Sequence, residues 1–178
     1  TRMLGPAGED VWASTFHSTC VRILRRDIEK LGFASSFTIY DSDDSLRVIK
    51  ESMKHLNMDD KQFPPRSVLG YISRAKDAML LADEYLAQCK ASGDFRLTKI
   101  ANIYMEYQRR LWEANALDFD DIILHTVRLL QQFEDVREFY QKKFRYVLID
   151  EYQDTNHLQY LLASLLAGGY QNFCVVGD

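Results

Sequence analysis

The chain has 178 residues, of which 47% are hydrophobic and 12% are aromatic, which provides enough apolar material for at least one ordinary core and excludes a disordered tail. Charged residues make up 27%, yet the net charge is only −4. This balance excludes a global basic field, so any contact with nucleic acid has to come from a local patch. Cys20, Cys89 and Cys174 lie far apart in apolar stretches, which favours reduced core thiols over a disulfide framework or a zinc site.

The two ends of the chain indicate where the protein acts and how complete it is. Residues 1–5 contain no apolar signal-peptide core, and no window approaches the ~20 continuous apolar residues of a membrane span. We therefore expect a cytoplasmic protein. Asp178 directly follows a run typical of a buried strand, so we expect an internal segment of a longer protein.

The first part of the chain predicts a short strand and two helices. Residues 11–16 favour the strand, and residues 17–31 carry apolar side chains at helical spacing with arginines on the opposite side. Gly32 is a plausible helix stop because it accepts a left-handed backbone. Residues 41–44 are a cluster of capping acids and serine, which predicts the start of the next helix.

The middle of the chain is expected to be all helical. Pro64 and Pro65 break the chain and open a helix whose apolar residues continue to Met79. Residues 97–111 and 119–133 show two further helical patterns.

The last fifth of the chain changes character. Residues 146–150 form a continuous apolar run that ends in an acid, as expected of a strand buried on both faces of a parallel sheet. Residues 158–166 favour a helix, two glycines end it, and residues 173–178 give a second strand of the same kind. The pattern predicts a β-α-β unit at the end of a helical module.

Asp150 and Glu151 follow the first of these strands, at the end where open α/β sheets bind ligands. In nucleotide hydrolases the first such acid holds Mg²⁺, and the second orients or deprotonates the attacking water. Taken alone, two acids after a strand are more typical of a solvated strand end than of a nucleotide site.

Longer motifs carry a more specific signal. Residues 150–156 read Asp-Glu-Tyr-Gln-Asp-Thr-Asn, which resembles the Walker B motif of UvrD/PcrA-type superfamily 1 DNA helicases. Residues 175–178 resemble the opening of that family's motif III, residues 15–26 are similar to its segment Ib with the following helix, and residues 117–121 match a further family block. The matches occur in the family's order over nearly the whole chain.

The resemblance implies a mostly α fold, in which a helical insert subdomain (1B) is attached to part of a RecA-like α/β P-loop NTPase domain (1A). Residues 18–143 would form the insert, and residues 1–17 and 144–178 would belong to the motor domain. The full-length parent would be an ATP-dependent 3′-to-5′ DNA helicase that uses Mg²⁺ with ATP and binds single-stranded and duplex DNA. DNA repair, replication and plasmid copying all stay open as the process served.

The same resemblance assigns roles around the strand end. Asp150 would bind the metal, Glu151 would act as the catalytic base, and three further residues would face the nucleotide: Gln153, Asp154 and Asp178. For the acids of the upstream block, helix capping is the favoured interpretation. These acids are Asp118, Asp120 and Asp121.

Two groups of residues are candidates for DNA contacts. Thr15, Phe16 and His17 would line the single-strand track, since an aromatic ring and an imidazole can stack on or bond to unpaired nucleotides; a core position is the alternative for Phe16. In the insert, the helix opened by the two prolines has unpaired N–H groups, and Arg66, Arg74 and Lys76 could follow a DNA backbone. The alternative is that these three cations are surface charges that pair with Asp77 or Asp83.

A phosphate loop of the form G-x-x-x-x-G-K-[ST] is missing, because no glycine in the chain is followed by lysine. We therefore expect the isolated chain to lack ATPase activity. Three other functions stay open: a motor subunit fragment of a helicase-nuclease complex, a metal-dependent nuclease using the acids near Asp150, and a non-enzymatic helical module that binds DNA or protein.

Overall fold

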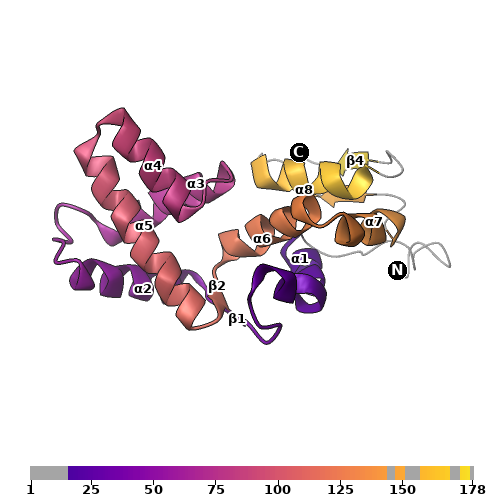
Figure 1. The fold of residues 1–178 in the computed structure, drawn as a ribbon, viewed down its shortest axis with the longest axis horizontal. Coiled ribbons are helices and arrows are strands. Elements are labelled where there is room, and N and C mark those ends of the chain that lie inside the picture. Colours follow the sequence, from indigo (N-terminus) through magenta and orange to yellow (C-terminus); the bar gives the residue numbers. More distant parts are fainter. Residues whose placement is uncertain (1–15, 144–146, 151–156, 169–172, 177–178) are drawn as a thin grey trace. The chain divides into compact units, whose positions relative to one another are not determined.

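The computed structural model describes residues 16–143, 147–150, 157–168 and 173–176, and these residues are mostly helical (Figure 1). The chain divides into two compact units. Residues 36–121 form the helical unit, and residues 1–35 with residues 122–178 form the split unit. The boundary falls inside helix α6 (Phe119–Gln132), between Asp121 and Ile122.

The helical unit is built around one long central helix. Its elements are β1 (Thr38–Ile39), α2 (Ser42–His55), α3 (Pro65–Asp77), α4 (Ala82–Ser92), α5 (Phe95–Glu113) and β2 (Ala116–Leu117). Helix α5 packs against α2, α3 and α4 (Figure 1). Its buried face, which includes Ile103 and Tyr107, forms a core with Ile49 of α2 and Ile72 of α3. Strands β1 and β2 pair in parallel.

Local signals explain where these helices begin and end. The Asp44 amide donates to Asp41 Oδ1 at 2.8 Å and the Asp41 amide donates to Asp44 Oδ2 at 3.2 Å, so the predicted cap of α2 is confirmed. Helix α3 begins at Pro65 as predicted, but it ends at Asp77. The expected extension to Met79 is wrong, because that residue adopts the left-handed region at φ 62°.

The split unit combines helices with a small parallel sheet. It contains α1 (Phe16–Asp27), the 3-10 helix η2 (Ile28–Leu31), most of α6, α7 (Glu134–Lys143), β3 (Val147–Asp150), α8 (His157–Ala167) and β4 (Phe173–Val176). Gly32 ends η2 at φ 95°, as predicted. Buried Cys20 behaves as a core thiol, since burial raises its pKa to about 12. In the residues described above, no helix is both long and apolar enough to cross a membrane.

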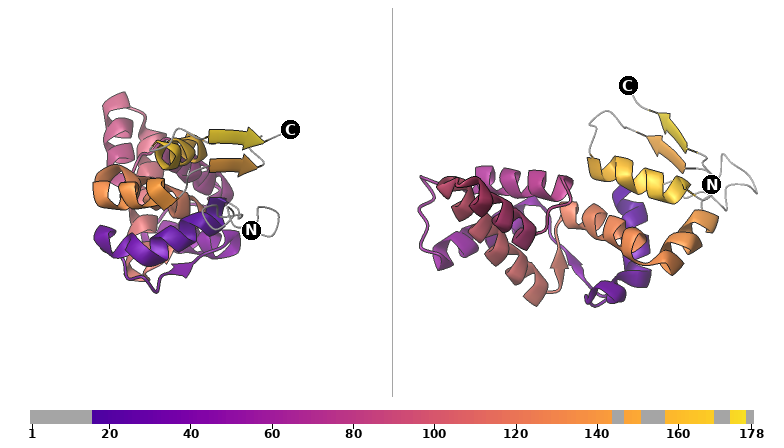
Figure 2. Two further views of the ribbon diagram at one scale, coloured as in Figure 1. Left: turned by 90° about the vertical axis from the view of Figure 1, so that its right-hand side faces the viewer. Right: turned by 45° about the horizontal axis from the view of Figure 1, so that its top comes forward.

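The β-α-β unit predicted from the last fifth of the chain is confirmed. Strands β3 and β4 pair in parallel with Val147 opposite Phe173, and they lie side by side in Figure 2. Helix α8 connects them and buries one apolar face, with Leu158, Leu162 and Leu166 nearly inaccessible to solvent.

Candidate functional site

The two parallel strands of the split unit end at the same edge. Asp150 is the last residue of β3, and its register partner Val176 is the last residue of β4. The carboxyl ends of parallel strands are where α/β sheets bind ligands, so the backbone holds Asp150 in the position expected of a nucleotide-facing acid.

A carboxylate at this edge fits a magnesium ion, because Mg²⁺ in nucleotide enzymes takes one or two carboxylates together with phosphate oxygens. The other residues predicted at this edge, Glu151, Gln153, Asp154 and Asp178, lie outside the described residues. Within the described part of the chain, no three His, Cys, Asp or Glu side chains come together as metal ligands.

The predicted single-strand track falls at the start of α1. Thr15 and the side chain of Phe16 lie outside the described residues. Phe16 opens the helix, and His17 is half-buried in its first turn. The backbone at Phe16 is thus already helical, one residue earlier than the sequence pattern predicted.

Helix α3 presents only part of the basic surface expected of it. Arg66 is exposed in the first turn, and exposed Arg74 places its guanidinium carbon 4.7 Å from the centroid of the Tyr71 ring. Lys76, in contrast, is completely buried. Its predicted role as a surface DNA contact is wrong, and so is the alternative of a surface charge paired with Asp77 or Asp83. Position 76 continues the buried stripe of Val68 and Ile72 at four-residue spacing.

Lys76 instead belongs to a buried ionic cluster within the helical unit. Its Nζ lies 2.7 Å from Asp118 Oδ2 and 2.9 Å from Asp121 Oδ1. The Tyr107 hydroxyl of α5 donates to the same Asp118 Oδ2 at 2.8 Å. The cluster therefore ties α3 and α5 to the start of α6.

The two acids of this cluster also cap α6. The Asp121 amide donates to Asp118 Oδ1 at 2.8 Å, and the Asp118 amide donates to Asp121 Oδ2 at 3.3 Å. The favoured interpretation of Asp118 and Asp121 as capping acids is confirmed. Their additional bond to Lys76 was missed, because the lysine precedes Asp118 by 42 positions.

Burial and charge act in opposite directions on this cluster. Burial alone would lower the pKa of Lys76, but attraction to Asp118 and Asp121 outweighs it and raises that pKa well above the ordinary value. Burial would raise the pKa of Asp118, yet the adjacent ammonium lowers it. Burial, followed by repulsion from Asp118, raises the pKa of Asp121 to about 7. The two carboxylates of the cluster therefore have pKa values shifted in opposite directions.

Comparison with known proteins places the chain in a family. Residues 2–178 match the UvrD/REP helicase N-terminal domain, and the chain belongs to this family. It is 48% identical over 176 residues to the "ATP-dependent DNA helicase PcrA" of Bacillus subtilis, a match that covers 99% of this chain and 23% of the relative.

Two staphylococcal relatives give the same result. Proteins with the same name from Staphylococcus aureus and Staphylococcus epidermidis are each 46% identical, over 177 and 176 residues, with 99% of this chain and 24% of the relative covered. The resemblance stated from the motifs is thus confirmed. The chain spans about a quarter of the length of these relatives.

Proposed function

We propose that this chain is the part of an ATP-dependent 3′-to-5′ DNA helicase that supplies the Walker B acids and a DNA-contacting helical subdomain. The observation that carries the proposal is the position of Asp150 at the carboxyl edge of a parallel strand pair, followed by the motif of residues 150–156. The names of the relatives support ATP and DNA as ligands.

The proposed subdomains follow from the same comparison. Residues 18–143 would form the insert 1B, which contains the whole helical unit, and residues 1–17 and 144–178 would belong to the RecA-like domain 1A. The β-α-β unit within residues 147–176 supports a motor-domain assignment for the end of the chain. The two compact units have other bounds than the proposed insert, because residues 18–35 and 122–143 group with the flanking segments.

In this proposal each acid at the strand end has a separate task. Asp150 would hold Mg²⁺. The bound ion would neutralise the charge that develops on the transferred phosphate. Glu151 would orient the attacking water and accept its proton. Gln153, Asp154 and Asp178 would line the nucleotide side of the same edge.

The proposed DNA contacts lie on α1 and α3. Thr15, Phe16 and His17 would contact the single strand, where base stacking on an aromatic ring is tolerant of sequence. Arg66 and Arg74 would contact the duplex backbone, and both are exposed. Lys76 takes no part in this surface.

An unwinding assay on the complete protein tests the proposal. We expect ATP-dependent separation of a duplex that carries a 3′ single-stranded tail, and no separation of the same duplex with a 5′ tail. Strand cleavage in Mg²⁺ or Mn²⁺ without unwinding would favour a nuclease instead. DNA binding with neither reaction would favour the non-enzymatic module.

A further inference from the structure

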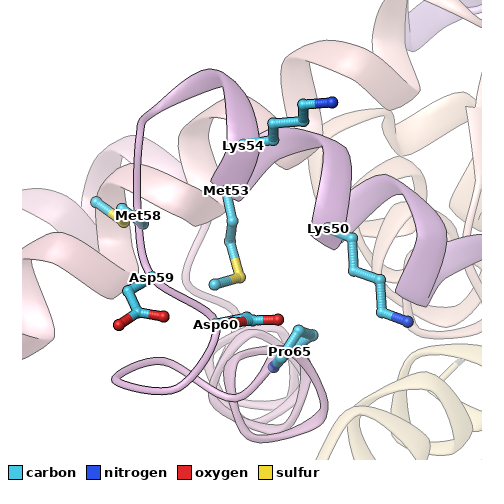
Figure 3. A pocket seen from close by; sticks show the side chains of 7 residues that line it. All are labelled: Lys50, Met53, Lys54, Met58, Asp59, Asp60 and Pro65. Carbon is cyan, nitrogen blue, oxygen red and sulfur yellow. The ribbon is translucent and has the colours of Figure 1, made fainter.

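The helical unit contains a hollow that is separate from the strand edge described above. It has a volume of about 360 Å³ and lies between α2 and the start of α3. Figure 3 shows Lys50 and Lys54 on α2, and Asp59 and Asp60 on the loop that follows this helix. Cations and acids line the hollow in equal number, so it favours neither an anion nor a cation and indicates no class of ligand.

In the split unit, a glutamine of α7 is bonded to the end of α8. The side-chain amide Nε2 of Gln141 donates to the carbonyl of Leu165 at 2.8 Å. Leu165 lies in the last turn of α8, and the final four carbonyls of a helix have no partner within that helix. The same turn contains no basic residue. The donor for this helix end therefore comes from α7.

Gly168 leaves the space that this hydrogen bond needs. It directly follows the last residue of α8, and a Cβ at this position would lie 2.8 Å from Gln141 Nε2. That distance is shorter than a normal contact of a side-chain carbon. Because Nε2 is the far end of a flexible side chain, the amide would move aside and its bond to Leu165 would be lost. We call Gln141, Leu165 and Gly168 the α7–α8 clamp.

Helix α7 is a well-anchored base for this clamp. Its residues Val136 and Tyr140 are buried in the split unit. On the surface, Arg26 of α1 places its guanidinium carbon 3.8 Å from the centroid of the Phe139 ring, a cation–π arrangement. Since these contacts hold α7 in place, the hydrogen bond from Gln141 restrains the end of α8.

Helix α8 in turn belongs to the strand edge of the candidate site. It packs against both β3 and β4. It begins at His157, directly after the motif of residues 150–156, and α7 ends at Lys143, shortly before β3 begins at Val147. The clamp therefore joins the two helices that flank β3 in the chain. The position of α8 fixes where the segment that follows Asp150 has to end.

We propose that Gln141 is a positioning residue for ATP hydrolysis, which holds α8 through Leu165 and thereby keeps the proposed base Glu151 in its productive position. This inference rests on the proposed helicase function. Gln141 is uncharged and lies on α7, so it acts on the geometry of the site. Misplacement of a catalytic group raises the barrier of the chemical step far more than it weakens binding.

The test compares variants of the complete protein that differ in whether residue 141 can donate. Gln141→Glu keeps the size of the side chain but places a carboxylate against the Leu165 carbonyl. Gln141→Lys keeps a donor, and a cation suits the end of a helix. Gln131→Glu makes the first change at an exposed position of α6 and is the control. DNA-stimulated ATP turnover is measured against ATP concentration, and circular dichroism checks the fold.

We expect Gln141→Glu to lower kcat about tenfold, within the roughly hundredfold loss that a 1 Å misplacement can cause, and to leave KM for ATP unchanged within about twofold. Gln141→Lys and Gln131→Glu should retain the wild-type kcat. A wild-type kcat in Gln141→Glu would reject the clamp and leave the helicase function standing, and so would an equal loss in Gln141→Lys. A wild-type protein without ATP turnover would reject both proposals.

Gly168→Ala tests the same hydrogen bond from an exposed position, where a substitution leaves the core intact. We expect Gly168→Ala to lower kcat as much as Gln141→Ala does. The double variant should lose no more than either single variant, because both changes remove one and the same bond. Losses that multiply in the double variant would show that the two residues act independently and would contradict the proposal.

Discussion

Lys76 is a single residue on which the stability of the helical unit depends. Substitution by Met would leave Asp118 and Asp121 buried without their cation, and loss of one partner of a buried ion pair costs about 3–5 kcal/mol. We expect Lys76→Met to lower the free energy of unfolding in urea by this amount. Lys90→Met, at an exposed position, should change it by less than about 0.5 kcal/mol. An equal effect of the two substitutions would show that the cluster does not stabilise the fold.

The same cluster predicts that the stability of the fold depends on pH. The pKa of Asp121 is raised to about 7 in the folded chain, whereas an unfolded aspartate has a pKa of about 3.9. Between these values the folded state keeps a proton that the unfolded state has released, so this group makes stability fall as the pH rises. The lowered pKa of Asp118 acts below this window, and the raised pKa of Lys76 acts above it.

Asp121→Asn tests this dependence, because the amide has no proton to lose. We expect urea unfolding between pH 4.5 and 7 to show a wild-type slope that is more negative than that of the variant, by at most about 1.4 kcal/mol per pH unit for one proton. Asp120→Asn, at the same helix start but partly exposed, should retain the wild-type slope. Identical slopes for the wild type and Asp121→Asn would contradict the assignment of a raised pKa.

For single residues, the sequence predicts hydrogen-bond and ion-pair partners that are close along the chain better than distant ones. Asp118 and Asp121 are three residues apart at the start of an apolar pattern, so their capping role follows from spacing. The pairing of Lys76 with these acids does not follow from spacing, because the fold of the chain brings α3 to the start of α6. The burial of Lys76 could have been predicted from its four-residue spacing to Val68 and Ile72.

Helices with a strong apolar periodicity, or with a glycine or proline at one end, could be predicted from the sequence. Helices α2, α5 and α6 have wide apolar faces, and Gly32 and Pro65 fall at helix ends. Strands β1 and β2 were not predicted, because two residues are too few to show alternation. Helix α4 was not predicted individually either, since Cys89 is its only fully buried residue.

The N-cap of helix α5 can be tested for its contribution to stability. The cap is Asp94, whose Oδ1 accepts from the Leu97 amide at 3.0 Å. We expect Asp94→Ala to lower the free energy of unfolding by about 1 kcal/mol, the usual loss for an N-cap. Because α5 packs against three helices, thermal unfolding should report the loss for the helical unit as a whole. The control is Asp60→Ala, in an exposed loop. An equal loss of unfolding free energy in the two variants would show that the Asp94 cap has no particular role in stability.

For the whole molecule, a site could be predicted from the sequence only where its residues are contiguous along the chain. The acids proposed for the strand end are contiguous in sequence and begin at Asp150, the last residue of β3, so a sequence motif was enough to predict them. The buried cluster, in contrast, draws Lys76, Tyr107 and Asp118 from different parts of the chain and has no sequence motif. Only packing of the helices brings these side chains together.

The 178-residue chain alone should not hydrolyse ATP. Its sequence contains no Gly-Lys pair and therefore no phosphate loop to hold the β- and γ-phosphates. Phosphate release by the purified chain with Mg²⁺, ATP and DNA is expected to equal the rate in buffer. Turnover above that rate, lost on Glu151→Gln, would show that these residues suffice for catalysis.

The central proposal, that residues 150–156 form the hydrolytic edge of a helicase motor, is tested most directly by Glu151→Gln in the complete protein. A base that acts on the attacking water contributes to the transition state far more than to binding. We expect DNA-stimulated ATP turnover to fall by at least about a hundredfold, with ATP affinity nearly unchanged and with normal turnover in the surface control Glu138→Gln. Turnover of Glu151→Gln equal to that of the wild type would contradict the account.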